Sequence, residues 1–190
     1  MKKFSTLIIT LLTGLIILLS AGCSAVTTMY PLSENPEPID KDKLEGSWLL
    51  NNEVFQVKFA SNGVAQIAAV QWKSNQFQIV HAEMTVTKGD KHNFFSLRSQ
   101  EDGKWMDKYY LLQYMVTQNN DLVVWNANVD EFENIVKSQI LPGTIQKNKS
   151  STIVSITNAP TKLLKLINGP ENIKLFDYKS PIILRKINNK

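Results

Sequence analysis

Hydrophobic and polar positions alternate in short runs between residues 44 and 126. In the clearest run, Phe55, Val57 and Phe59 alternate with Gln56 and Lys58, which is the pattern of a strand buried on one face. The same kind of pattern recurs along this part of the chain. The seven expected strands are Gly46–Leu50, Val54–Phe59, Val64–Trp72, Phe77–Thr87, His92–Arg98, Trp105–Thr117 and Asp121–Asn126.

Short polar turns separate these runs. Asn and Gly accept a positive φ at little cost, and they occur in Ser61-Asn62-Gly63, Lys88-Gly89-Asp90 and Asn119-Asn120. Strands joined in this way predict an antiparallel meander, which closes as a barrel or stacks as a sandwich because an open edge invites aggregation. We therefore expect one mainly β globular domain over residues 44–190, with barrel and sandwich both open at this point.

The C-terminal third departs from the alternating pattern and predicts two short helices. Apolar residues from Val129 to Ile140 recur on one helical face, and Asn128 is placed to cap it. A second helix is expected over Pro160–Ile167. Two more strands are expected, at Ser151–Ile156 and, closing the sheet, at Pro181–Ile187.

The N-terminus has the layout of a secretion signal over residues 1–22. Lys2 and Lys3 precede an apolar core from Leu7 to Leu19, and small residues then lead to Cys23. A membrane-spanning helix needs roughly 20 apolar residues, a length that this run reaches only if Ser20 and its small neighbours are counted. The pattern therefore favours a cleaved signal over a retained membrane helix.

The segment LSAGC resembles the lipobox of bacterial lipoproteins, with Leu19 one position earlier than the usual pattern places it. The resemblance implies that Cys23 carries a diacylglycerol thioether and, after cleavage, an N-linked acyl chain such as palmitate. Cys23 is the only cysteine, so the rest of the chain has no disulfide or thiol nucleophile. Ser24 stands where aspartate resembles an inner-membrane retention signal, which favours the outer membrane, facing the periplasm, if the cell has two membranes.

Residues 24–43 carry three prolines and scattered charges without a period of 2 or 3.6. This composition predicts a flexible tether between a lipidated Cys23 and the domain. A flexible chain of this length spans roughly 25 Å. We therefore expect the domain to stand near a membrane without being pressed into it.

Gly46-Ser47-Trp48 at the first strand resembles the G-x-W signature of lipocalins. The resemblance covers this tripeptide and one distant residue. It implies a lipocalin-like eight-stranded barrel in which Trp48 packs at the closed end, and an arginine from the last strand, here Arg185, stacks over it. It also implies a cavity for an apolar ligand.

The charge balance and the spacing of ionisable residues argue against a nucleic-acid-binding face and a metal site. Of the 21 basic side chains, Lys2 and Lys3 belong to the signal, which leaves 19 against 17 acidic ones. This balance gives no basic face for nucleic acid. His81 and Glu83 share one side of a strand, but no third metal ligand stands at a familiar spacing. The acidic run Asp130–Glu133 is explained by its position at a helix start.

No common hydrolase, metalloprotease or nucleotide-binding motif occurs in the sequence. We therefore expect no catalytic activity, metal or cofactor. Aromatic residues lie on several strands, and core packing explains them better than a cavity lining does. They are Trp72, Phe77, Phe94, Phe95, Trp105, Tyr109, Tyr110, Tyr114 and Trp125.

The sequence thus favours a binding or interaction module held at the membrane, with a small apolar ligand or another envelope protein as its partner. The alternative is a structural or assembly factor of the envelope. An envelope hydrolase is the least supported reading, and His81 is the one base that it offers.

Overall fold

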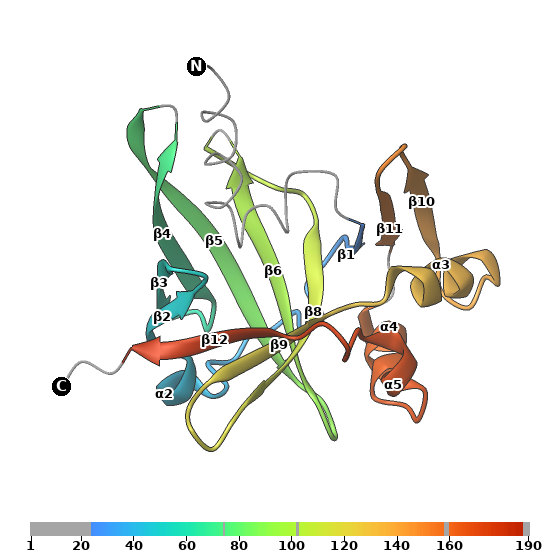
Figure 1. The fold of residues 1–190 in the computed structure, drawn as a ribbon. Coiled ribbons are helices and arrows are strands. Elements are labelled where there is room, and N and C mark those ends of the chain that lie inside the picture. Colours follow the sequence, from blue (N-terminus) through green and yellow to red (C-terminus); the bar gives the residue numbers. More distant parts are fainter. Residues whose placement is uncertain (1–23, 74, 102, 158–159, 188–190) are drawn as a thin grey trace.

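The computed structural model describes residues 24–73, 75–101, 103–157 and 160–187. The expected signal and the expected lipidation site, Cys23, lie outside the described residues. Eight antiparallel strands close into a barrel (Figure 1). They are β2 (Gly46–Leu50), β3 (Glu53–Phe59), β4 (Ala65–Lys73), β5 (Gln76–Lys88), β6 (Asn93–Glu101), β8 (Tyr109–Val116), β9 (Leu122–Asn126) and β12 (Ile182–Ile187).

The barrel is closed because each of its strands pairs with a neighbour on both sides, and two strands complete the cycle. β8 pairs with both β6 and β9, and β12 pairs with both β9 and β2. The expected mainly β fold is therefore confirmed, and the structure selects the barrel over the sandwich. The C-terminal strand is the closing strand, as its position in the sequence predicted.

Most strand boundaries agree with the alternating pattern within a few residues. The exception is the run Trp105–Thr117, which is broken. β7 (Lys104–Trp105) pairs only with the end of β6, and β8 begins at Tyr109. β2 and β3 are joined by Asn51 and Asn52, whose φ values of 49° and 70° suit the tight turn of a two-residue hairpin.

The segment expected to be a flexible tether belongs to the fold, and that prediction was wrong. β1 (Ala25–Thr28) pairs in parallel with β11 (Thr152–Ile156) and antiparallel with β8. Farther along, Leu32 is buried, and its backbone N–H donates to the Ser96 hydroxyl at 3.0 Å. A four-residue strand beside prolines shows too short a pattern to be recognised. Its main partner, β11, lies more than a hundred residues farther along the chain, so the local sequence gives no sign of the pairing either.

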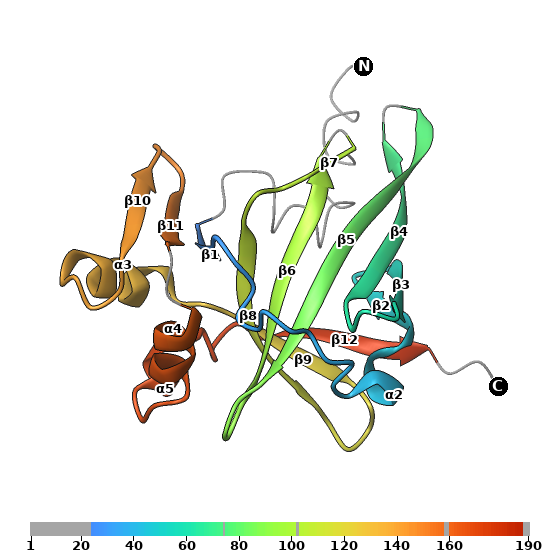
Figure 2. The same cartoon turned by 180° about the vertical axis from the view of Figure 1, so that it is seen from behind.

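A smaller α/β unit is attached to the barrel through β1. Its sheet contains β1, β11 and β10 (Gly143–Lys147). Beside it lie the helices α3 (Val129–Lys137), α4 (Pro160–Ile167) and α5 (Asn172–Leu175), as Figures 1 and 2 show. Phe94 and Leu111, on the outer face of the barrel, join Phe132 and Val154 in one buried cluster. This shared cluster holds the two units together.

The helices of the smaller unit agree in part with the sequence. The Asn128 side chain caps α3 by accepting from the backbone N–H of Asp130 at 3.2 Å, as predicted. α3 ends at Lys137, three residues earlier than expected. α4 has the expected bounds, whereas α5 and β10 were not predicted.

The short helix α2 (Lys41–Leu44) lies at one end of the barrel (Figure 2). The Trp48 indole N–H donates to the Leu44 carbonyl at 2.8 Å, and Trp48 is 1% exposed. The Lys186 ammonium donates to the carbonyls of Asp42 and Lys43 and lies 5.4 Å from the centroid of the Trp48 ring. A lysine therefore satisfies helix carbonyls that lack an intrahelical partner.

The expected stacking of Arg185 on Trp48 was wrong. In the pairing of β12 with β2, Lys186 is opposite Trp48, whereas Arg185 is opposite Leu49 and is exposed. Successive residues of a strand point to opposite faces. Leu184 points into the barrel, so Arg185 points outward and Lys186 takes the place expected for the arginine.

Candidate functional site

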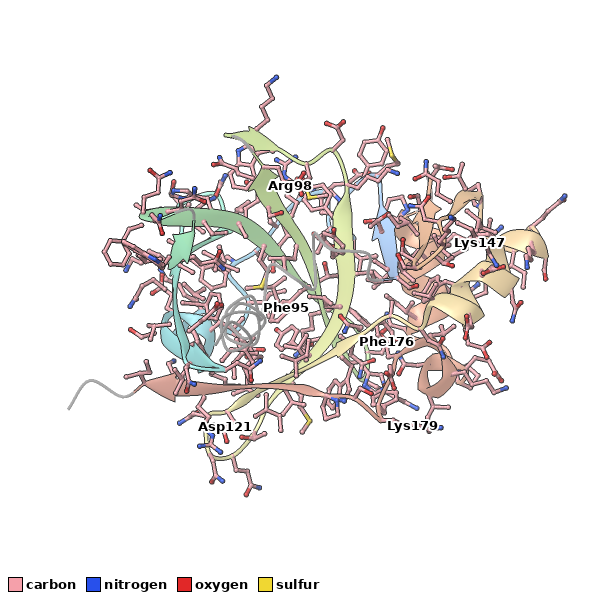
Figure 3. All side chains as sticks on the ribbon, turned by 45° about the horizontal axis from the view of Figure 1, so that its top comes forward. Phe95, Arg98, Asp121, Lys147, Phe176 and Lys179 are labelled. Carbon is pink, nitrogen blue, oxygen red and sulfur yellow. The ribbon has the colours of Figure 1, made fainter. Side chains whose placement is uncertain are left out.

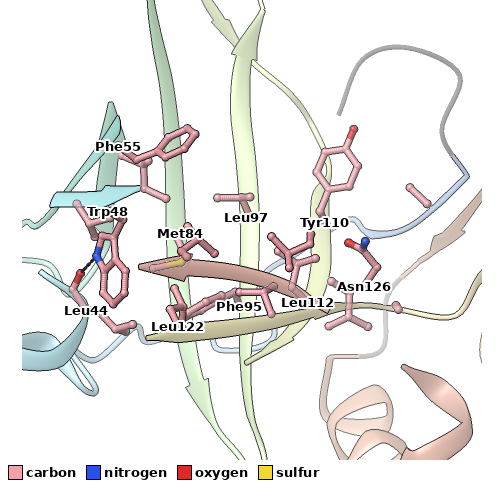
Figure 4. Close-up of a pocket in the computed structure, with 18 of the residues that line it drawn as sticks. Leu44, Trp48, Phe55, Met84, Phe95, Leu97, Tyr110, Leu112, Leu122 and Asn126 are labelled. Atoms are coloured by element: carbon pink, nitrogen blue, oxygen red, sulfur yellow. Dashed lines mark hydrogen bonds between the residues drawn. The ribbon is translucent and has the colours of Figure 1, made fainter. Parts of the chain in front are cut away.

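The barrel encloses a cavity of about 120 Å³. Its walls are predominantly apolar, and the close-up in Figure 4 shows side chains converging on it from opposite strands. Residues that contribute to the lining include Trp48, Phe55, Met84, Phe95, Leu97 and Leu112. Ligand cavities are commonly built in this way, with an apolar lining and a few polar groups.

Strand alternation decides which side chains reach the cavity. Phe95 on β6 lines the cavity, whereas the preceding residue, Phe94, belongs to the cluster of the smaller unit. On β8, Leu112 lines the cavity, and Leu111 borders both the cavity and that cluster. The Phe95 ring also stacks on the Tyr114 ring, with ring centroids 3.8 Å apart. The large aromatic and aliphatic side chains therefore both form the core and line the cavity.

The end of the barrel beside α2 is closed by buried side chains. Leu44 and Trp48 contribute to the lining there. Nearby, the Tyr114 hydroxyl donates to Asp40 Oδ2 at 3.1 Å. Burial, with the adjacent Asp40 carboxylate, raises the pKa of Tyr114 far above its usual value, so the phenol stays neutral and serves as a hydrogen-bond donor.

The cavity reaches the side of the barrel where β8 changes its partner. Leu112 pairs with Asn126 of β9, but Tyr110 pairs with Thr27 of β1. At this seam Ser24 and Asn126 are two of the few polar residues in the lining. The Ser24 hydroxyl accepts from the backbone N–H of Thr152 at 2.9 Å. The first described residue of the chain therefore borders the cavity.

Glu53 lies at the opposite end of the barrel from α2, after the turn that follows β2. It shares the inward face of β3 with Phe55. Both of its carboxylate oxygens are buried without a hydrogen-bond partner among the described residues, and so is the amide nitrogen of Gln71. Burial raises the pKa of Glu53. No sequence pattern distinguishes this glutamate from an exposed strand residue.

We expect Glu53→Gln to stabilise the protein at neutral pH. Because the pKa of Glu53 is raised in the folded state, its contribution to stability is greatest below its usual pKa and is lost as the pH rises through the higher folded value. Glutamine has no charge to desolvate. In urea unfolding near pH 7 the variant should therefore have the higher free energy of unfolding. Near pH 4 the free energies of unfolding of the two proteins should agree within about 0.5 kcal/mol. An equal difference at both pH values would contradict this assignment.

His81 and Glu83 do not form the acid–base pair that their positions on one strand allowed. His81 is exposed, while the Glu83 carboxylate accepts from Arg98 Nε at 2.6 Å. Arg98 also lies 4.8 Å from the Tyr109 ring and 5.4 Å from the Trp105 ring. Within the described ranges, no three residues of the metal-binding types form a group that could hold a metal ion.

His92 belongs to the contact between the two units. It is half-buried, and its Nδ1 lies 3.3 Å from the Gln113 amide nitrogen. Burial lowers the pKa of His92, with a smaller effect from Lys91. The Tyr178 hydroxyl donates to Gln113 Oε1 at 2.9 Å. This histidine therefore takes part in a structural network on the outer face of the barrel and does not face the cavity.

The acidic residues at the start of α3 have structural partners as well. Glu133 is buried, and its Oε1 lies 2.5 Å from the ammonium of Lys137 and 2.7 Å from that of Lys147. These two lysines hold the pKa of Glu133 below its usual value. Together with the Asn128 cap, this arrangement explains the acidic run without a bound cation.

The predicted aromatic residues occupy three different environments. Phe95 and Tyr110 line the cavity. Trp125 packs on Tyr178, with ring centroids 5.2 Å apart, on the smaller unit. Trp72, which we expected in the core, is 56% exposed. In Figure 3, Phe95 lies within the barrel, whereas Phe176 lies toward the helices of the smaller unit.

No family model, curated protein or solved structure matches the chain. The eight-stranded barrel is the topology that the G-x-W resemblance implies, but membership of the lipocalin family stays a prediction. Among the described residues, no helix is long and apolar enough to cross a bilayer. Function is therefore argued from the cavity and its surroundings.

Proposed function

We propose that this protein is a cell-envelope lipoprotein whose barrel binds an apolar, chain-shaped molecule. The observation that carries the proposal is the cavity inside the barrel, with apolar walls and polar residues at one seam. A core serving packing alone has few voids larger than a water molecule. The cavity therefore favours a binding role over a purely structural or assembly role.

The size of the cavity favours a slender ligand. A volume of about 120 Å³ is well above the roughly 10–15 Å³ that a single water needs, and it suits one alkyl chain better than a bulky ring system. Each buried methylene contributes about 0.8 kcal/mol. A single chain held along the barrel would thus gain several kcal/mol without any charged contact.

The proposed lipid anchor indicates that the membrane is the source of this ligand. If Cys23 is lipidated, as the lipobox resemblance implies, the membrane attachment lies one residue before Ser24, which borders the cavity. The cavity would then be held beside a bilayer, where molecules with alkyl chains are abundant. We place the protein at the outer membrane, facing the periplasm, in a cell with two membranes, and assign it no catalytic step.

Ligand binding is tested with cis-parinaric acid, a fatty acid whose fluorescence rises in apolar surroundings. We expect saturable binding to the processed wild-type protein. In Leu112→Trp the indole occupies part of the cavity, so the affinity should fall about tenfold or more. Met115→Trp is the matched control, because Met115 lies on the same strand but is 48% exposed.

Two outcomes would contradict the binding role. One is the absence of saturable binding to the wild-type protein. The other is equal affinity for wild type and Leu112→Trp when circular dichroism shows that both are folded. The anchor is tested separately, by the intact mass and membrane fractionation of wild type beside Cys23→Ala. Lipidation predicts a mass increase from acyl chains and a membrane association that the variant loses.

A further inference from the structure

The hairpin of β4 and β5 extends beyond the rest of the barrel (Figures 1 and 2). Pairing of β4 with β3 ends at Ala69, and pairing of β5 with β6 ends at Ala82. Beyond these points the two strands pair only with each other, from Val70 opposite Ile79 to Lys73 opposite Gln76. The tip is therefore a two-stranded ribbon, which is marginally stable in water unless something packs against it.

One face of this ribbon is apolar and exposed. Val70 is 61% exposed, Trp72 56%, Phe77 74% and Ile79 63%. Directly paired residues of antiparallel strands share a face, and Val70 pairs with Ile79 as Trp72 pairs with Phe77. The two rings are in contact, with centroids 4.8 Å apart. We call these four residues the hairpin patch.

The hairpin patch differs from ordinary surface exposure of apolar residues. Single exposed apolar side chains are normal, but a contiguous group marks an interaction surface. The other large exposed hydrophobic residues lie on several other elements; Met115 and Ile183, for example, are 48% and 51% exposed and are separated by Val123, which is buried. The ribbon is also amphipathic, because Gln71 and Gln78 pair with each other on its other face.

We propose that the hairpin patch inserts into the interfacial layer of a lipid bilayer. Residues 64–82 contain no aspartate or glutamate, so the ribbon presents no carboxylate that anionic lipid would repel. Tryptophan favours the membrane interface, where its ring is buried and its N–H stays hydrated. Two aromatic and two branched aliphatic side chains at the end of a projecting ribbon suit shallow insertion.

The position of the N-terminus supports a bilayer as the occupant. Residues 25–28 form a strand of the fold, so a lipid anchor on Cys23 would have no tether to keep the barrel away from the membrane. Figures 1 and 2 place both the start of β1 and the hairpin tip away from α2. This inference goes beyond the proposed function and does not require that the cavity hold a ligand.

The test uses the processed protein reconstituted into vesicles of phosphatidylethanolamine and phosphatidylglycerol. Part of the phospholipid carries bromine on its acyl chains, which quenches tryptophan fluorescence on contact. We expect quenching of the wild-type protein and loss of most of it in Trp72→Gln. Trp105→Gln is the matched control, because it removes a tryptophan outside the hairpin and should leave the quenching intact.

A second pair of variants keeps every tryptophan. Val70→Gln, Phe77→Gln and Ile79→Gln combined should weaken the quenching of Trp72, because three of the inserted side chains are lost. The same change at Val54, Met115 and Ile183, which are 46%, 48% and 51% exposed, should have no effect. These residues are also large, apolar and exposed, although less so than the hairpin set, and they lie on other strands.

Quenching that is absent from the wild type, or unchanged in Trp72→Gln, would overturn the proposal. If the wild-type protein is unquenched and dimeric, and the triple hairpin variant is monomeric, the hairpin patch instead binds a second copy of the chain. An unquenched monomer would point to another protein as the partner. If mass spectrometry shows no acyl chain, the same processed chain is mixed with the vesicles, and Trp72 quenching is still expected because the patch does not depend on Cys23.

Discussion

Replacing Trp48 by alanine is expected to lower the free energy of unfolding by about 3–5 kcal/mol, because the change leaves a large void in a packed core. Trp48 is 1% exposed and lies among the residues that close the barrel beside α2. Its indole N–H also donates to the Leu44 carbonyl at 2.8 Å. Urea unfolding followed by far-UV circular dichroism measures the loss.

Two further substitutions separate the contributions at this end of the barrel. Trp48→Phe keeps most of the apolar volume but removes the indole donor, so it should cost less than Trp48→Ala. Lys186→Met should cost about 1–2 kcal/mol, because the ammonium contacts helix carbonyls and the indole ring. Arg185→Met should cost less than about 0.5 kcal/mol, as is usual at exposed sites. A larger cost for Arg185 than for Lys186 would contradict the observed geometry.

The barrel strands were predictable because their signals are local. Phe55, Val57 and Phe59 alternate with polar residues within one short run, and turn residues mark the ends of such runs. β1 and β10 give no comparable signal. β1 has four residues and pairs mainly with β11, whose position depends on the folding of the whole smaller unit. Local patterns therefore predicted the barrel but not the sheet attached to it.

Two errors concern the direction of a side chain rather than the presence of a strand. The residue type suggested Arg185 as the partner of Trp48, but strand alternation places Lys186 there. Trp72 was expected in the core, yet it lies on the outer face of a ribbon that its neighbouring strands do not reach. Which face is buried depends on where neighbouring strands end, and the sequence of one strand does not contain that information.

The cavity was implied only by resemblance to lipocalins. Its volume depends on how side chains from eight strands fit together after the barrel closes, and alternation alone does not distinguish a filled barrel from a hollow one. The polar residues where β8 changes its partner could not be predicted from the sequence either, because Ser24 reaches that place through the pairing of β1. Sequence reasoning thus predicted the type of scaffold, while the candidate site depended on the tertiary structure.

Replacing Phe132 by alanine should also cost about 3–5 kcal/mol, although this residue lies outside the barrel. Phe132 is fully buried on α3, in a cluster that also contains Phe94 and Leu111 from barrel strands. Because the cluster is shared, we expect the smaller unit and the barrel to unfold together. For each protein, far-UV circular dichroism and tryptophan fluorescence should therefore give the same unfolding midpoint. That midpoint should be lower in the variant than in the wild type.

Ile140→Ala is the matched control for Phe132→Ala. The sequence placed both residues on the apolar face of one helix, but α3 ends at Lys137 and Ile140 is 47% exposed. The control should therefore cost less than about 1 kcal/mol. Separate transitions in Phe132→Ala, with the barrel unaffected, would show that the two units are energetically independent. Coincident transitions would mean that β1, and with it the residue that follows the proposed anchor, is held in place by the stability of the whole barrel.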